Sequence, residues 1–326
     1  MMARLAVTPQ VYPYSDLSTR TFSLGIAALG SIWLSGCTAG RLDRASGKTL
    51  IEGDLVAQAR LALEKSRVVL EAGGLGLSDI VTIVQYVTPA ALPDMPKLFA
   101  MYREVFGGRI PSVNTIVVRR LLRAKALIEI ESVAGNGTGA GFEYLPFVSG
   151  KDRADAHGRA LGALIARGLS WGDVVRSTEL MTDAAFAEEP SLNAGAPSGL
   201  CVVMPRVLDD GAGAQIQMTA SRTKDCPVLY LCAEGDPRAG GVEEQCREIY
   251  ARLREQLSTA GSGIEWVVKT TEFVTPAGLA GYRGTADVRR EVFAAPYPAA
   301  TGVVCDRLMN PDAHIAVDVV AIRKAA

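Results

Sequence analysis

The stretches SDIVTIVQYVTP (78–89), GDVVRSTELMTD (172–183) and EWVVKTTEFVTP (265–276) decide the fold, because they are three copies of one pattern. Each copy has an apolar pair, then alternating residues, then an apolar residue followed by Thr. Alternation of this kind predicts a β-strand. A pattern that recurs three times predicts three copies of one structural unit, and such repeats must be recognised before any fold is assigned.

Two further motifs recur around these strands. One begins with Pro and carries an Arg nine residues later, and its Arg residues are Arg120, Arg206 and Arg307. The other is a short strand motif that precedes the first helix of each unit: IWLSG (32–36), PFVSG (146–150) and LYLCA (229–233). Together the motifs divide the chain into three predicted units, residues 1–137, 138–223 and 224–326.

The pattern of each unit predicts the element order β-β-α-β-α-β-β, which is an α+β fold. Helices are expected over about 54–72, 93–106, 152–168, 241–261 and 277–293, from apolar periodicity and from terminal glycines. In the second unit the second helix is expected to be lost or reduced to a loop, because Thr182 and Pro197 are close in sequence. A sheet with helices on one face must cover its other face. We therefore expect three sheets around one axis, a single-chain pseudotrimer that is a monomer in solution.

Composition restricts the classes of function. The chain has 326 residues, 48% hydrophobic and 21% charged, with a net charge of -1. This composition is globular and gives no general attraction for nucleic acid or an anionic membrane, so we expect a small-molecule ligand. Six cysteines without a C-x-x-C pair and two histidines, His157 and His314, predict neither a metal site nor a disulfide framework. A reducing cytoplasm is the expected location.

The N-terminal segment allows a second interpretation. Residues 22–37 are apolar, and the LSGC box at 34–37 is similar to a lipoprotein cleavage site in which Cys37 would be lipidated. The strand motif explains the same residues, because its counterparts at 146–150 and 229–233 lie far inside the chain. A strand is therefore the preferred interpretation.

The first unit resembles the Rid family, also called the YjgF or L-PSP endoribonuclease family. The resemblance rests on PYS (13–15), LSG (34–36), LEAGGLGLSDIVTIVQYV (70–87), MYREVF before IPS (101–112) and IEIESVAG (128–135). It implies homotrimer-like units with sites in the clefts between them. It also implies hydrolysis of enamines and imines without a metal or an organic cofactor.

The resemblance implies catalytic roles for Tyr14, Ser35, Gly36 and Glu129, the last of which would place or activate water. It also implies an Arg two residues after the Pro that clamps a substrate carboxylate. That Arg is replaced by Val113, Gly199 and Ala300 in the three units, and the family's Asn is replaced by Phe99. The substrate is therefore expected to be uncharged, or to be held from elsewhere, or not to be turned over.

Other polar residues fall near the predicted clefts. Glu179 and Glu272 occupy the position of Gln85; they are acid/base candidates if their face of the sheet lines a cleft, and ordinary carboxylates if it faces solvent. Ser35, Ser149 and Cys232 are aligned as equivalents. A thiol in this place could act as a nucleophile or simply fill a small space. The remaining substrate-binding candidates are Thr115, Cys201, Cys232, Arg120, Arg206 and Arg307, and the three Arg residues could instead form ion pairs between units.

The sequence favours a diverged enzyme that hydrolyses or deaminates a small imine, enamine or carbonyl compound. Three alternatives remain open: a binding or regulatory scaffold, a biosynthetic enzyme of chorismatase or ring-hydrolase type, and a ribonuclease. The scaffold agrees with the loss of the clamp Arg in every unit. The ribonuclease is disfavoured by the near-neutral charge.

Overall fold

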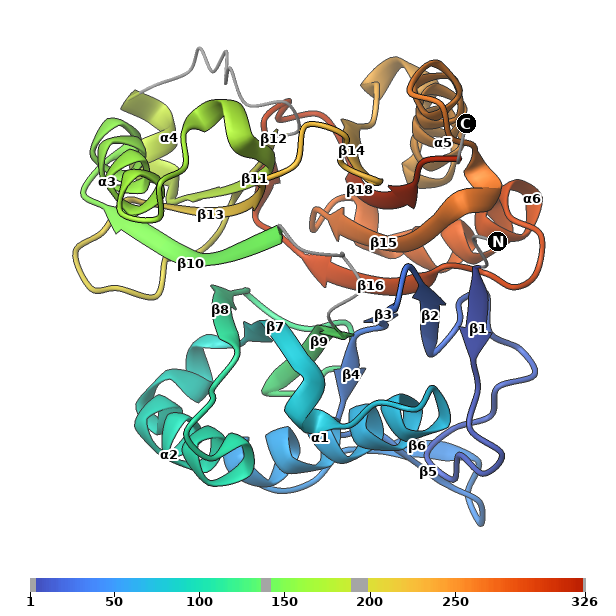
Figure 1. Ribbon diagram of the computed structural model, residues 1–326. Helices are drawn as coiled ribbons and strands as arrows, with labels where there is room; N and C mark the ends of the chain where they lie inside the picture. Colours follow the sequence, from blue (N-terminus) through green and yellow to red (C-terminus); the bar gives the residue numbers. More distant parts are fainter. Residues whose placement is uncertain (1–3, 136–141, 189–198, 325–326) are drawn as a thin grey trace.

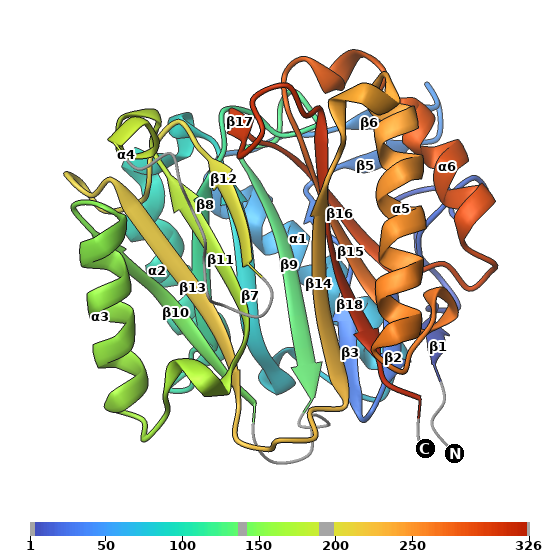
Figure 2. The same ribbon diagram turned by 90° about the horizontal axis from the view of Figure 1, so that it is seen from above.

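The computed structural model describes residues 4–135, 142–188 and 199–324. These residues form three large sheets, one small two-stranded sheet and the helices that cover them. Figure 1 shows the three sheets facing one another in the middle of the molecule, with the helices on the outside. The view from above in Figure 2 shows that α3 and α5 lie on opposite sides of the strands.

The first sheet has the order β1-β2-β3-β9-β7-β8, with β4 also paired to β9. Its outer face is covered by α1 (Leu55–Ala72) and α2 (Met95–Phe106). The Asp54 side chain begins α1 by accepting a hydrogen bond from Ala57 N at 2.9 Å. The strands are β1 (Leu5–Val7), β2 (Gly25–Ala28), β3 (Ser31–Leu34), β4 (Cys37–Thr38), β7 (Ile80–Val87), β8 (Ser112–Val117) and β9 (Ile128–Gly135), and β5 (Arg41–Asp43) and β6 (Lys48–Leu50) form the separate hairpin.

The second sheet has the order β10-β13-β11-β12-β17, and its last strand comes from the C-terminal part of the chain. It is covered by α3 (Arg153–Ile165) and by the short α4 (Asp183–Glu188). Its strands are β10 (Phe142–Gly150), β11 (Val174–Met181), β12 (Gly199–Val203), β13 (Ala214–Ser221) and β17 (Arg307–Leu308).

The third sheet has the order β14-β18-β15-β16. Its helices are α5 (Val242–Thr259) and α6 (Thr285–Val292), which bury one face of the sheet. Its strands are β14 (Val228–Glu234), β15 (Val267–Val274), β16 (Ala299–Val304) and β18 (Ile315–Ile322).

The three sheets share one pairing scheme. The strands β7, β11 and β15, which carry the repeated pattern, pair antiparallel with β9, β13 and β18. The same three strands pair parallel with β8, β12 and β16. The register makes Gln85, Glu179 and Glu272 equivalent, since they lie beside Thr115, Cys201 and Gly302 respectively.

The inner faces of the sheets bury one another. A single hydrophobic cluster contains Tyr86 of the first sheet, Leu180 of the second and Phe273 of the third. Separate clusters join each sheet to its own helices. Period-two geometry explains this division, because adjacent strand residues point to opposite faces.

A small cavity of about 50 Å³, lined by both apolar and charged side chains, lies among the inner faces of the sheets. Two ion pairs of its lining cross between sheets: Lys269 Nζ lies 2.7 Å from Glu131 Oε2, and Arg176 contacts Asp318. The register also makes Thr82, Arg176 and Lys269 equivalent. Thr82 pairs with Val133, Arg176 with Thr219 and Lys269 with Val320. The register likewise makes Glu131, Gln217 and Asp318 equivalent, beside Val84, Thr178 and Thr271.

The expected helices and repeated strands are present, with small changes at their ends. The second helix of the second unit is shortened to α4, and the segment after it lies outside the described residues. The last long helix begins at Thr285 and not near residue 277, because 3-10 turns occupy residues 278–284. Within residues 22–37 the chain forms the strands β2 and β3 and the start of β4, in agreement with the strand interpretation of this segment. Of the helices described, none has the length and apolar character needed to span a bilayer.

Candidate functional site

Ser35 and Gly36 join the first sheet to the third, at what we call the first–third interface. Gly36 N donates hydrogen bonds to Ala300 O at 3.2 Å and to Thr301 Oγ1 at 3.0 Å. The Ser35 hydroxyl donates to Ser23 O at 2.6 Å and accepts from Ala300 N at 2.8 Å. Both groups are therefore engaged in holding the interface together.

The other two interfaces use the same edges of the sheets. At the first–second interface, Phe147 N donates to Asn114 Oδ1 at 2.9 Å. At the second–third interface, the Cys232 thiol lies 3.1 Å from Gly199 O. The positions Val113, Gly199 and Ala300 therefore all lie on interface strands, with no Arg at any of them.

Glu129 lies on β9 at the first–third interface. Its side chain points toward Gly36, because a β-carbon added to Gly36 would lie 2.3 Å from Glu129 Oε1 and 2.8 Å from Thr301 Cγ2. Glu129 is 8% exposed, and no group in the described part of the chain donates a hydrogen bond to its carboxylate. Burial, and after it the charge of Glu131, raises the pKa of Glu129 to about 7.

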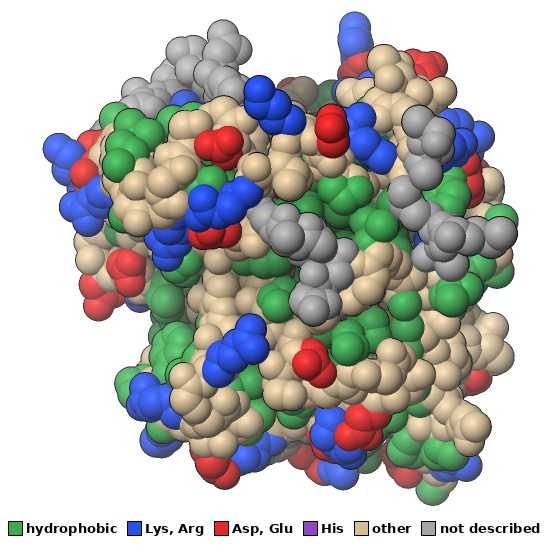
Figure 3. All heavy atoms as spheres, viewed as in Figure 1, with side chains coloured by type: hydrophobic (Ala, Val, Ile, Leu, Met, Phe, Trp, Pro, Cys, Tyr) green, Lys and Arg blue, Asp and Glu red, His purple; other side chains and the backbone are tan. Residues whose placement is uncertain are grey.

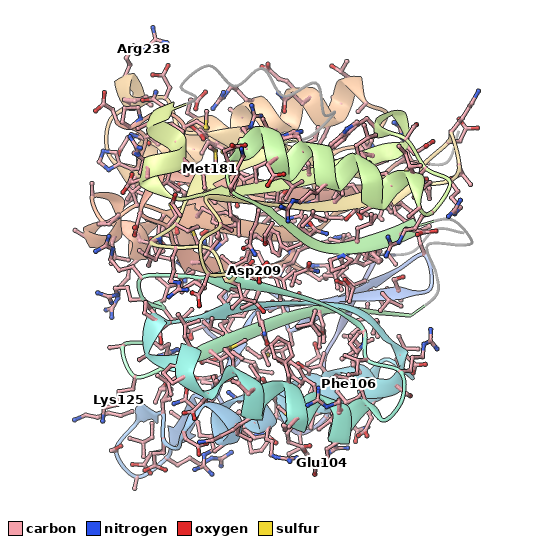
Figure 4. The ribbon with its side chains drawn as sticks, turned by 90° about the vertical axis from the view of Figure 1, so that its left-hand side faces the viewer. Glu104, Phe106, Lys125, Met181, Asp209 and Arg238 are labelled. Carbon is pink, nitrogen blue, oxygen red and sulfur yellow. The ribbon has the colours of Figure 1, made fainter. Side chains whose placement is uncertain are left out.

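The equivalents of Glu129 lack a carboxyl group. Glu129, Gln215 and Ala316 lie opposite Tyr86, Leu180 and Phe273. Gln215 Nε2 donates to the Ser149 hydroxyl at 2.8 Å, and Ser149 also bonds to Asp209. Figure 4 shows Asp209 between the lower tier of the molecule, which holds the first sheet, and the upper tier. At this register position the first–third interface therefore has a buried carboxyl group, where the other two sheets have an amide and a methyl group.

The register corrects one sequence alignment. Ser149 pairs with Gln215, whereas Thr38 pairs with the equivalent residue Glu129. The counterpart of Ser149 is therefore Thr38 and not Ser35. Cys232 pairs with Asp318, the equivalent of Glu131, which places it near the level of Ser35 and Gly36. Sequence spacing gave no sign of this difference in register.

Tyr14 lies away from Glu129. Burial is the largest cause of the raised pKa of Tyr14. Of the charged groups that act on its hydroxyl, Glu64 raises the pKa, and Arg67 and Arg41 lower it. The Lys65 ammonium lies 5.4 Å from the centre of the Tyr14 ring. Tyr12 is the tyrosine beside Cys37, whose strand pairs with β9 next to Glu129.

Glu179 faces the helix layer, so neither the cleft nor the solvent interpretation describes it. Arg153 Nε of α3 lies 2.6 Å from Glu179 Oε2, and His157 Nε2 lies 3.1 Å from Oε1. Although burial works in the opposite direction, hydrogen bonds from His157 and Arg153 lower the pKa of Glu179. The raised pKa that a general acid/base would need is therefore absent at this residue.

Glu272 has an equivalent environment in the third sheet. Arg289 Nη1 of α6 lies 2.6 Å from Glu272 Oε1, and the Tyr282 hydroxyl donates to Oε2 at 2.7 Å. The Tyr250 hydroxyl donates to Oε1 at 3.2 Å. Two carboxylates that the sequence offered as acid/base candidates thus anchor helices to sheets.

Thr115 and Cys201 also face the helices. Thr115 Oγ1 accepts a hydrogen bond from Gln85 Nε2 at 2.8 Å. The Cys201 sulfur lies 3.7 Å from Met181 Sδ, and burial raises the pKa of Cys201 to about 12. A thiol that stays protonated is a poor nucleophile.

The repeated arginines lie at the ends of the interface strands. Arg120 Nε and Arg206 Nε donate to the next residue's carbonyl, at 3.5 Å and 3.3 Å. Arg307 Nη2 lies 3.0 Å from Asp183 Oδ1 and stacks 4.2 Å from the Phe186 ring, so it joins the third unit to the second. The structure brings none of them into contact with Glu129.

Sequence reasoning missed the cations near Glu129. Lys269, Arg123 and Lys65 all lower the pKa of Glu129, although less than burial raises it. They come from β15, from the loop after β8 and from α1, so no spacing in the sequence connects them. No group of three or more His, Cys, Asp or Glu residues in the described chain could hold a metal ion.

The sequence matches the model of one family. The model described as Endoribonuclease L-PSP matches residues 16–135 and 231–323. The chain therefore belongs to the L-PSP endoribonuclease family, also called Rid, as its first unit indicated.

The curated relatives match about a quarter of the chain. A RutC family protein of Pyrococcus horikoshii is 33% identical over 93 residues, which are 28% of this chain and 71% of the relative. Protein DfrA of Myxococcus xanthus is 33% identical over 85 residues, 26% of this chain and 63% of the relative.

Among solved structures, the Rid protein YyfA of Yersinia pestis covers 41% of this chain and 99% of its own, with 26% identity and a TM-score of 0.35. The YjgF gene product of E. coli covers 40% and 98%, with 25% identity and a TM-score of 0.34.

Proposed function

We propose that this protein hydrolyses or deaminates a small imine, enamine or related carbonyl compound at the first–third interface. The observation that supports it is Glu129, a buried carboxyl group with no hydrogen-bond donor and a pKa of about 7. A base is most effective when its pKa lies near the working pH. The absence of a side chain at Gly36 leaves the space that the carboxylate occupies.

The proposed reaction needs one water and one proton carrier. Water adds to the carbon of the C=N bond while the Glu129 carboxylate accepts the proton that the water loses. Glu129 returns this proton to the nitrogen, which gives a carbinolamine. It then carries the hydroxyl proton of the carbinolamine to the nitrogen as the C–N bond breaks and the C=O bond forms, and a carbonyl compound and ammonia leave. Both steps use the same carboxyl group, which explains why an intermediate pKa is suitable.

A binding scaffold is the second candidate, and a specific observation favours it. The Ser35 hydroxyl and the Gly36 N–H are already hydrogen-bonded across the interface, so they are not free to hold a ligand. No comparable observation supports ribonuclease activity as a function of this protein. On the face in Figure 3, basic and acidic side chains are interspersed, without the single basic patch that a nucleic acid would need.

The deciding experiment is turnover of a panel of small imines, half of them neutral and half carrying a carboxylate, with ammonia release as the measurement. We expect Glu129→Gln to reduce kcat/KM by at least about a hundredfold, the effect typical of a lost general base. Glu104→Gln is the matched control, because Glu104 is exposed and pairs with Arg60 on the outer helices. Unchanged turnover in Glu129→Gln would exclude the mechanism, and binding without turnover in the wild type would establish the scaffold.

We also propose that the chain is a single-chain pseudotrimer with units at 1–137, 138–223 and 224–326. The shared pairing scheme and the common central cluster support it. On this proposal the surfaces that associate in a homotrimer are already buried within one chain. We further propose that it works in the cytoplasm, since the spacing of its six cysteines is not that of a disulfide framework.

A further inference from the structure

A buried ion pair of the central cavity reaches the first–third interface. Lys269 of β15 is 6% exposed, and its ammonium lies 2.7 Å from Glu131 Oε2 of β9. The same ammonium donates to Leu34 O at 3.0 Å and to the hydroxyl oxygen of Thr301. Since an ammonium has three N–H donors, all of them are used. Lys269 is therefore held as a cation in one place.

Thr301 of β16 connects this ion pair to Gly36. Its hydroxyl oxygen accepts hydrogen bonds from Lys269 and from Gly36 N, the latter at 3.0 Å. The single hydroxyl proton is donated to the Glu131 carboxylate. A β-carbon added to Gly36 would lie 3.0 Å from Thr301 Oγ1 and 2.3 Å from Glu129 Oε1. The ion pair therefore fixes one side of the space in which the Glu129 carboxyl group lies.

Glu129 and Glu131 lie on the same face of β9, because alternate residues of a strand point the same way. Their α-carbons are about 7 Å apart, a distance over which charges interact strongly inside a protein. Glu131 accepts hydrogen bonds from the side chains of Lys269, Thr301 and Tyr86. Although burial works in the opposite direction, Lys269 lowers the pKa of Glu131. The Glu131 carboxylate is thus a fixed negative charge beside Glu129.

Charges from several elements act on Glu129. Burial raises its pKa most and Glu131 raises it next, while Lys269 is the first of the cations that lower it. The other titratable groups that interact with Glu129 are those of Arg123, Lys65, Cys37 and Tyr86. Arg123 is exposed, so salt screens its charge. Burial raises the pKa of the thiol and of the hydroxyl, which stay uncharged near neutral pH. Glu131 and Lys269 are therefore the two charges whose opposition matters most at Glu129.

We propose that Lys269 and Glu131 are positioning residues for Glu129. Their hydrogen bonds hold the segment against which its carboxyl group lies, and their opposite charges determine how readily that group gives up its proton. A lysine of the third sheet thus acts on an acid of the first, so the acid has its strength only while the two sheets are joined. This inference rests on the proposed function for the use made of the proton, but the acidity itself can be measured without a substrate.

Carbon-13 NMR of the full chain, labelled at the glutamate carboxyl carbon, measures the pKa of Glu129, and Glu129→Gln identifies its signal. The wild type should give about 7. Glu131→Gln removes the anion and should lower this pKa by about 1. Adding Lys269→Gln to that variant removes the cation and should raise the pKa again by about the same amount. A loosened interface would instead admit water and lower the pKa in both variants, so the opposite signs separate an effect of charge from a loss of structure.

Lys269→Gln alone is the second variant, in case Glu131→Gln leaves a buried cation and does not fold. With Glu131 present, the two carboxyl groups titrate as a pair. The last proton of this pair should leave at a higher pH than in the wild type, because the nearest cation is gone. Thermal unfolding of each variant verifies that it is folded.

Asp318→Asn is the matched control, because Arg176 and Asp318 form the equivalent ion pair between the second and third sheets in the lining of the same cavity. It should move the pKa of Glu129 by less than about half as much as Glu131→Gln does. An unchanged pKa in Glu131→Gln, or a further fall when Lys269→Gln is added, would overturn the positioning roles.

Turnover separates this inference from the proposed function. Where both hold, the apparent pKa of kcat/KM follows the pKa from NMR in each variant. The expected shifts in NMR, together with a wild type that turns over no imine, would keep the positioning roles and remove the hydrolase. Turnover that is lost in Glu129→Gln, together with an unmoved pKa in Glu131→Gln, would do the reverse.

Discussion

The Lys269 ammonium of the third sheet lies 2.7 Å from the Glu131 carboxylate of the first sheet, and both side chains are at most 10% exposed. Glu131 also accepts hydrogen bonds from the Tyr86 hydroxyl, at 3.1 Å, and from Thr301. Buried ion pairs of this kind leave a costly unpaired charge when one partner is removed.

Lys269→Met should therefore lower the free energy of unfolding by about 3 to 5 kcal/mol. Urea denaturation measures the loss, and the double variant Lys269→Met/Glu131→Gln should recover a large part of it. The control is Arg247→Met, whose ion pair with Glu291 is exposed and contributes at most about 1 kcal/mol. Equal effects of the two single variants would contradict a buried, coupled pair.

Glu129→Gln should change the dependence of stability on pH. The native carboxyl group keeps its proton up to a pKa of about 7, while an ordinary glutamate loses it near 4.5. The native state therefore binds more protons between these values, and wild-type stability falls as pH rises through them. Glutamine cannot ionise, so above pH 7 the variant should be more stable than the wild type, by up to about 3 kcal/mol. Near pH 4.5 the difference should vanish.

The same pKa predicts the pH profile of the proposed reaction. A carboxyl group acting as a base must be ionised, so kcat/KM should rise through an apparent pKa of about 7. The profile is measured on the wild type with a neutral imine, which itself carries no titrating carboxylate. A rate that is constant between pH 5 and 8 would exclude Glu129 as the base.

Gly36→Ala should disturb the site by a steric route. The new methyl group would lie 2.3 Å from Glu129 Oε1, so the carboxylate must move. A displacement of about 1 Å from a reacting group lowers rates by about a hundredfold. The expected loss of stability is about 1 to 3 kcal/mol. Gly108→Ala is the control, since its added carbon meets no atom within 4 Å. Retained turnover in Gly36→Ala would separate Gly36 from the site.

Glu179→Gln should destabilise the fold by about 3 kcal/mol, because it leaves Arg153 without its buried carboxylate. The pKa of Glu179 is lowered, so its contribution is present above the ordinary value of 4.5 and is lost as pH falls through the native pKa. The difference from wild type should therefore shrink in acid. Turnover per folded molecule should not change. A fall in kcat with unchanged stability would restore Glu179 as a catalytic candidate.

The proposed pseudotrimer predicts one chain per particle. Light scattering should give a mass near 34.5 kDa across a wide range of concentrations. A particle of about three times that mass would show that trimer surfaces remain free on the chain.

The repeated strands could be predicted from sequence because their pattern is local. Alternation predicted β7, β11 and β15 within a residue or two of their ends. The short β1 was missed, since three residues carry no detectable period. The alignment of Ser149 was wrong for a related reason: a short motif matched by residue type does not fix the register in which its strand pairs.

The candidate site was predictable only in part. Glu129 could be found because it lies in a strand motif that resembles the family. Its neighbours Lys65 and Arg123 come from a helix and a loop, and Thr301 comes from the third unit. For Glu179 and Glu272, the sequence predicted the position but not the surroundings of the side chain. Their repeated position was correct, but whether their face meets helices, a cleft or solvent depends on packing that no single strand encodes.

The charges of the central cavity make the three units different from one another. Lys269 and Arg176 take the place of Thr82, and Gln217 takes the place of Glu131 and Asp318. If any one unit assembled with two copies of itself, each position would carry the same side chain three times. Three lysines or three glutamates would then meet in a buried space. Joining the units in one polypeptide removes that restriction, and oppositely charged neighbours can arise. In the proposed pseudotrimer no unit could therefore replace the other two, because three copies of it would bring like charges together in the buried space.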